Sequence, residues 1–171
     1  MNKKLLLTLL VAIMATTAWG QRFAYVDTEY ILDNIPEYQA AEREIEQLSV
    51  EWQAELEDKF AEVDRLYREY QAEAPLLPDE MKQEREDEII QLEQQAKELQ
   101  MKRFGREGEL FQKRQELLEP IQEKVYDAVE EIASRGNYAV IFDRAGGVSM
   151  IYTDVRYDLS DDVLERLGYR N

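Results

Sequence analysis

A helical pattern that runs from Pro36 to about Arg135 constrains this chain more than any other feature. Apolar residues recur in it every three or four positions, and a proline-rich turn at residues 74–79 is the main interruption. Two long helices joined by a short connection fold back on each other as an antiparallel hairpin. Short segments with strand-like alternation flank the pattern on both sides. The sequence therefore predicts an α+β chain, mostly α, with a long helical-hairpin arm on a small β head.

Each predicted arm helix carries one narrow apolar stripe, which is typical of coiled-coil-like pairing. The positions on the outgoing helix lie within about 60° of one direction when residues advance by 100°. The outgoing stripe consists of Tyr38, Ala41, Ile45, Leu48, Trp52, Leu56, Phe60, Val63, Tyr67 and Tyr70. The returning stripe consists of Met81, Ile89, Leu92, Ala96, Leu99, Leu110, Leu117, Ile121, Val125, Ala128 and Ile132.

Two glycines interrupt the returning helix. Gly105 and Gly108 each cost about 1 kcal/mol relative to Ala inside a helix, so we expect a kink or a short break there. A hinge in the arm and a local packing need both explain such a break, and the residues alone leave the two explanations open.

The predicted head is built from the two ends of the chain, residues 21–35 and 136–171, with the arm at 36–135. Residues 23–26 form one expected strand, and residues 138–142 and 148–152 form a β-hairpin across Gly146 and Gly147. Asp27 and Ser160 are expected to cap short helices, and Gly168 to end the last one.

So small a head, without disulfides, cannot bury a convincing core alone. We therefore expect the head to mediate oligomerisation. The residues expected to do so are Tyr25, Val26, Val140, Phe142, Met150 and Tyr152.

The first 20 residues have the pattern of a cleavable secretory signal. Lys3 and Lys4 precede an apolar run at residues 5–15, and the small residues Ala18 and Gly20 place cleavage before Gln21. The run is shorter than the roughly 20 apolar residues that span a bilayer. A retained N-terminal anchor is the alternative interpretation of this segment.

Composition excludes several functional classes. The chain has no Cys and no His, which argues against Cys–His or Ser-His-Asp catalysis and against a zinc site. We therefore expect no enzyme, no metal and no cofactor. Removing the two signal lysines leaves 19 basic against 37 acidic residues, a net charge of −18. The negative electrostatic field of so acidic a chain repels phosphate groups, which disfavours nucleic acid as a partner.

Four segments, in order along the chain, resemble the Skp/OmpH family of periplasmic chaperones. The segments are YVD at 25–27 with PE at 36–37, KRQELLEPI at 113–121, GNYAVIFD at 136–143 and DLSDDVL at 158–164. The resemblance covers essentially the whole mature chain. It implies a homotrimer whose heads share a β-barrel, and ATP-independent holding of unfolded outer-membrane proteins in the periplasm.

The arm departs from this family in its charge. The best-known members are basic, whereas residues 36–104 here hold 20 acidic and nine basic side chains. This acidity argues against contact with lipopolysaccharide or a membrane and against acidic clients.

A holding chaperone needs exposed apolar groups, so apolar residues off the stripes are the candidates for client contact. Ile90 and Met101 project well away from the stripe that contains Leu92, and Phe104 lies about 120° from it. Leu76 and Leu77, at the tip of the arm, complete this set. The alternative function is a coiled-coil spacer or scaffold of the cell envelope, which needs a wholly polar outer face.

Overall fold

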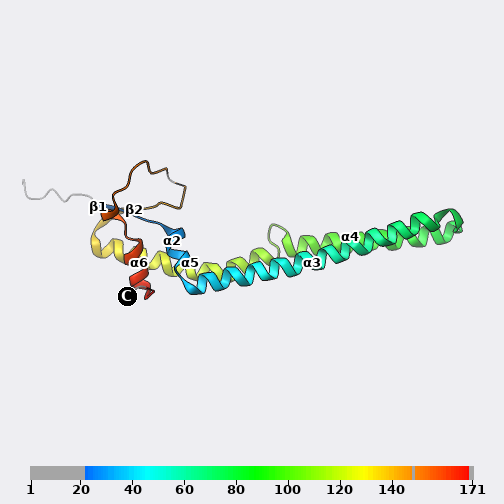
Figure 1. Cartoon of the computed structure of the whole chain (residues 1–171), viewed down its shortest axis with the longest axis horizontal. Helices are drawn as coiled ribbons and strands as arrows, with labels where there is room; N and C mark the ends of the chain where they lie inside the picture. Colours follow the sequence, from blue (N-terminus) through cyan, green and yellow to red (C-terminus); the bar gives the residue numbers. More distant parts are fainter. Residues whose placement is uncertain (1–21, 148, 170–171) are drawn as a thin grey trace, which may run out of the picture. The chain divides into compact units, whose positions relative to one another are not determined.

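The hairpin predicted from the sequence is present in the structure, a computed structural model that describes residues 22–147 and 149–169. Helix α3 (Pro36–Glu73) begins at a proline, whose missing N–H costs nothing in the first helical turn. The 3-10 turn η2 (Ala74–Leu76) ends it, and α4 (Asp79–Phe104) returns along it (Figure 1). The predicted signal peptide lies outside the described residues.

The interruption predicted at Gly105 and Gly108 is a complete break. Helix α4 ends at Phe104, and α5 (Glu109–Gly136) starts four residues beyond Gly105. Backbone hydrogen bonds from Gly105 N to Met101 O, 2.9 Å, and from Gly108 N to Gly105 O, 2.9 Å, tighten the connection. Pro120 lies inside α5, which continues on both sides of it.

The chain divides into two compact units. The hairpin unit consists of residues 35–124, and the strand unit consists of the described residues in 22–34 and 125–169. The boundaries inferred from the sequence, at residues 35/36 and 135/136, stay a prediction.

The strand unit contains a two-stranded parallel sheet. Strands β1 (Arg22–Val26) and β2 (Tyr138–Asp143) pair in a register that places Ala24 opposite Ile141. Parallel strands need a long crossover, and residues 27–137 supply it. Helix α2 (Thr28–Asp33) follows β1, and its N-terminus is capped as predicted, because the Asp27 carboxylate accepts from Tyr30 N at 3.0 Å.

The β-hairpin predicted across Gly146 and Gly147 is not formed, because the described residues 149–152 contain no strand. The chain turns instead toward the edge of β1 that β2 leaves open. There Asp158 bridges Tyr25, and Leu159 N donates to Tyr25 O at 2.9 Å. Residues 149–157 include the 3-10 turn η3 (Val155–Tyr157) and serve as the connection to that edge, so they are not a third strand.

The core of the strand unit forms around β1, α2 and α6 (Ser160–Leu167). Ile31 and Val163 are fully buried, and Arg166 pairs with Glu131 of α5 at 2.5 Å. Gly168 ends α6 as predicted, in the left-handed region at φ 87°. No helix among the described residues is both long enough and apolar enough to cross a bilayer.

Ser160 corrects the predicted cap of α6. It is the first helical residue and is buried, and it makes no cap hydrogen bond. Its hydroxyl accepts from Asp27 N at 2.8 Å and donates to the Asp158 carboxylate at 2.6 Å. Ser160 therefore links the end of β1 to the start of α6.

Replacing Ser160 by Ala is expected to lower the free energy of unfolding by about 1–3 kcal/mol, because Asp27 N–H loses its partner in a partly buried site. Chemical denaturation measures the change. Ser149→Ala, in the exposed connection, is the matched control and should change stability little. Equal effects of the two substitutions would contradict this role for Ser160.

Candidate functional site

The two hairpin helices pack through a repeat of seven residues. On α3, the buried and half-buried positions include Ile45, Trp52 and Leu66, and a second series of Leu56, Val63 and Tyr70. Helix α4 follows the same spacing, with Ala96 fully buried between the helices' apolar stripes. A seven-residue repeat is the geometry of paired helices that wind around each other.

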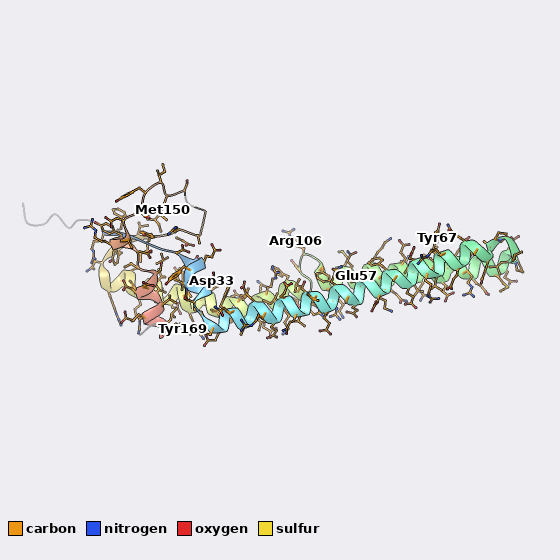
Figure 2. The ribbon with its side chains drawn as sticks, viewed as in Figure 1. Asp33, Glu57, Tyr67, Arg106, Met150 and Tyr169 are labelled. Carbon is orange, nitrogen blue, oxygen red and sulfur yellow. The ribbon has the colours of Figure 1, made fainter. Side chains whose placement is uncertain are left out.

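This repeat leaves part of the predicted apolar stripe on the surface. Phe60, Tyr67 and Met81, which were expected in the seam, are exposed, and Tyr67 is 49% exposed. Leu66, next to Tyr67, takes the inner position instead. Figure 2 shows Tyr67 on the half of the hairpin nearest the turn.

An open groove of about 690 Å³ runs beside the seam in this half of the hairpin. We call it the tyrosine groove. Its lining residues are Phe60, Val63, Asp64, Tyr67 and Tyr70 of α3, and Glu86, Ile89, Ile90 and Glu93 of α4. The Tyr70 hydroxyl donates to the Glu86 carboxylate and so ties the two helices together, and this hydrogen bond raises the pKa of Tyr70.

Three of the five residues predicted for client contact are exposed, as a contact residue must be. Leu76 is 87% exposed at the turn, and Met101 and Ile90 are 70% and 50% exposed on α4. Leu77 is half-buried beside Leu76. Of these residues, only Ile90 lies in the tyrosine groove. Their part in client contact stays a prediction.

Phe104 occupies a different setting from the other candidates. It is half-buried, and its ring meets that of Trp52 edge to face, with 6.5 Å between the ring centres. The Arg103 guanidinium covers the same Trp52 ring at 4.6 Å. Phe104 therefore packs within a cluster at the break between α4 and α5.

Arg103 connects all three helices that meet at this break. Its Nε and Nη2 atoms donate to Glu55 of α3 at 3.2 and 3.1 Å, and Nη1 donates to Glu109 at the start of α5. Figure 2 shows Arg106 in the loop that stands off between α4 and α5.

The two glycines of the break are closely surrounded by backbone. A Cβ on Gly105 would lie 2.3 Å from Met101 O, and one on Gly108 would lie 2.9 Å from both Arg103 O and Lys102 O. These distances give both glycines a packing role. Hinge motion at Gly105 and Gly108 stays a prediction.

The pairing of Glu109 predicts that the stability of the break depends on pH. The hydrogen bond from Arg103 lowers the pKa of the Glu109 carboxyl below its ordinary value. A carboxyl whose pKa is depressed on folding adds stability that is present above its unfolded pKa and is lost as the pH falls through its folded pKa. We therefore expect wild type to melt above Glu109→Gln at neutral pH, and the gap to narrow as the pH falls below the ordinary pKa of a Glu carboxyl, about 4.3. Thermal melts across this range test it, with Glu107→Gln as control; a gap that does not change with pH would refute the pairing.

The residues predicted to mediate oligomerisation of the head fall into two groups, one buried and one largely exposed. Tyr25 and Val26 are buried within the strand unit, whereas Val140, Phe142 and Tyr152 are exposed and Met150 is half-buried. Tyr25, Phe142, Met150 and Tyr152 line one open cavity of about 730 Å³. Their role in oligomerisation stays a prediction.

Sequence reasoning missed Phe60 and Tyr67 as surface residues because it assigned them to the seam. The sequence does contain a pattern that could have placed them. Val63, Leu66 and Tyr70 are spaced by three and four residues, so they form an alternative apolar stripe to the one that contains Tyr67. A strict seven-residue register would have placed Leu66 inside and Tyr67 outside.

Comparisons with known proteins agree with this architecture. Residues 22–167 match the family described as outer membrane protein (OmpH-like). A crystal structure of a candidate outer membrane chaperone (OmpH-like) from Caulobacter crescentus CB15 superposes with a TM-score of 0.68 at 11% sequence identity. The alignment covers 86% of this chain and 84% of that one. No curated protein matches the chain.

Proposed function

This chain belongs to the OmpH-like family of outer membrane proteins, and from that membership we propose that it is a chaperone of the periplasm. It binds unfolded outer-membrane proteins without ATP and prevents their aggregation during transit. The predicted signal peptide supports export to that compartment.

The observation that carries the proposal is the apolar surface of the hairpin unit. Large apolar side chains are exposed at intervals along it and are separated by charged ones. They are Val50, Phe60, Tyr67, Leu76, Met81, Ile90, Met101 and Phe111. A surface of this kind offers weak apolar contacts at many points to an unfolded chain. A spacer of fixed length has no need of them, so the surface favours the chaperone over the scaffold alternative.

Assembly as a homotrimer through the strand unit is part of the proposal. The exposed apolar side chains of β2 and the open cavity beside them support it, since a second copy would remove them from water. Native mass spectrometry of residues 21–171 should give three copies. A monomer at micromolar concentration would contradict this part.

Removing exposed apolar side chains should weaken holding without unfolding the protein. We expect the triple variant Leu76→Ser, Ile90→Ser and Met101→Ser to need about tenfold more protein for half-suppression of aggregation, because apolar contact area is lost. Light scattering after dilution of a urea-unfolded outer-membrane β-barrel protein, without ATP, measures this.

The matched control replaces three exposed glutamines by Ser, namely Gln71 near the end of α3 and Gln91 and Gln100 of α4. It should hold the client as wild type does, and circular dichroism should show unchanged helicity for both variants. Failure of the wild-type protein to suppress aggregation would overturn the proposed function. Full suppression by the triple variant would remove these three residues from it.

A further inference from the structure

The tyrosine groove combines an apolar lining with an acidic rim. Phe60, Tyr67 and Ile90 present exposed apolar surface, and Asp64, Glu86 and Glu93 supply three carboxylates around it. Among the described residues, none that line the groove is Lys or Arg. A groove of this size and composition suits a ligand that has an apolar group next to a positively charged one.

Two of the three rim carboxylates, those of Asp64 and Glu93, pair with exposed cations, whereas Glu86 accepts a hydrogen bond from Tyr70. Asp64 pairs with Arg68 at 2.8 Å and Glu93 with Lys97 at 2.6 Å, and all four side chains are about half exposed or more. Such pairs contribute little to stability, so the carboxylates can exchange one cation for another.

The surrounding segment strengthens the field at the groove. Residues 57–93 contain 13 Asp and Glu against five Lys and Arg, a net charge of −8. A field of one sign raises the local concentration of oppositely charged partners and speeds their encounter.

We infer that the tyrosine groove binds a basic stretch of unfolded polypeptide, in which aromatic or aliphatic side chains alternate with Lys or Arg. This inference rests on the proposed function and names the client segment that the chain selects. Phe60 and Tyr70 are ten residues apart, which is about 15 Å along α3. An extended chain covers this distance in about five residues.

An alternating segment matches both parts of the groove. Its apolar side chains face the groove at every second position, toward Tyr67 and Ile90. The intervening Lys or Arg side chains have long apolar stems, so their charged ends reach Asp64 and Glu93 at the rim. A segment with Glu in those places would be repelled.

Fluorescence anisotropy tests this with two labelled peptides and the full mature protein. In one peptide Phe and Leu alternate with Lys, and in the other Glu replaces every Lys. We expect at least about tenfold tighter binding of the lysine peptide, and a loss of this preference as salt screens the charges. The double variant Tyr67→Ser and Ile90→Ser should bind the lysine peptide about tenfold more weakly, or weaker still.

The charge variants separate the groove from the general acidity of the hairpin. The double variant Asp64→Asn and Glu93→Gln should bind the lysine peptide about fivefold more weakly than wild type does. Glu51→Gln with Glu98→Gln removes the same charge from exposed positions outside the groove and should change the affinity less.

The possible failures are distinguishable. A protein that holds its client but binds both peptides equally, or whose groove variants bind as wild type does, overturns the inference and leaves the proposed function standing. A protein that suppresses no aggregation overturns the proposed function whatever the peptides do. A groove variant with an altered oligomer mass in sedimentation would mean that a second copy occupies the groove, which also overturns the inference.

Discussion

Replacing Leu56 by Asp is expected to open the hairpin and to lower the free energy of unfolding by at least about 3 kcal/mol. Leu56 is only 3% exposed, in the seam between α3 and α4. Removal of a buried leucine side chain alone costs about 2–5 kcal/mol. The new carboxylate adds a desolvation penalty, because an isolated buried charge is strongly unfavourable. Circular dichroism during thermal and chemical denaturation measures both the loss of helicity and the loss of stability.

Leu76→Asp is the matched control, since the same substitution falls on a residue that is 87% exposed at the turn. It should leave the melting temperature within a few degrees of wild type. Equal destabilisation by the two variants would contradict the assignment of Leu56 to the seam. An unchanged melting temperature for Leu56→Asp would contradict it equally.

Replacing Gly108 by Ala is expected to disrupt the break between α4 and α5 and to cost about 1–3 kcal/mol. Gly108 is buried, and the new Cβ would lie 2.8 Å from Gly105 N as well as close to two carbonyl oxygens. These neighbours are backbone atoms, so the connection itself must move. Its displacement would also disturb the contacts of Arg103 with Glu55 and Glu109.

Hydrogen exchange over residues 101–112 measures this local loosening, and denaturation measures its cost. Arg106→Ala introduces an alanine at an exposed position of the same loop and should have little effect. Unchanged exchange in Gly108→Ala would show that the connection accepts a side chain, and would favour a hinge over a packing role for this glycine.

The helix boundaries could be predicted from the sequence because local chemistry sets them. Pro36 starts α3, the proline-rich segment ends it, and the two glycines interrupt the returning helix. Each of these residues acts on its own backbone, through a missing N–H or a missing Cβ, so no tertiary contact is needed to recognise it.

The pairing of the strands could not be predicted in this way. The turn residues Gly146 and Gly147 are compatible with a hairpin, but the segment that follows them bridges β1 through Asp158 instead. Strand pairing depends on which edge the rest of the chain leaves open, and that is a property of the assembled unit.

The exposure of the candidate contact residues was predicted in part. Ile90, Met101 and Leu76 were recognised because they project away from the apolar stripe or lie in the turn, and all three are exposed. Phe60 and Tyr67 were missed. They lie at the margin of the apolar stripe. There a repeat of 3.6 residues predicts a buried side chain, whereas a repeat of 3.5 residues predicts an exposed one.

The sequence alone therefore determined where the hairpin helices begin and end, the family of the chain and the acidity of its hairpin. Only the tertiary structure decided that Phe60 and Tyr67, at the margin of the α3 stripe, are exposed, which strands pair, and that Ser160 joins β1 to α6 rather than capping a helix. The physical reason is the range of the interactions. Backbone dihedral preferences and caps act within a few residues, whereas burial and strand pairing depend on partners that lie far away in the chain.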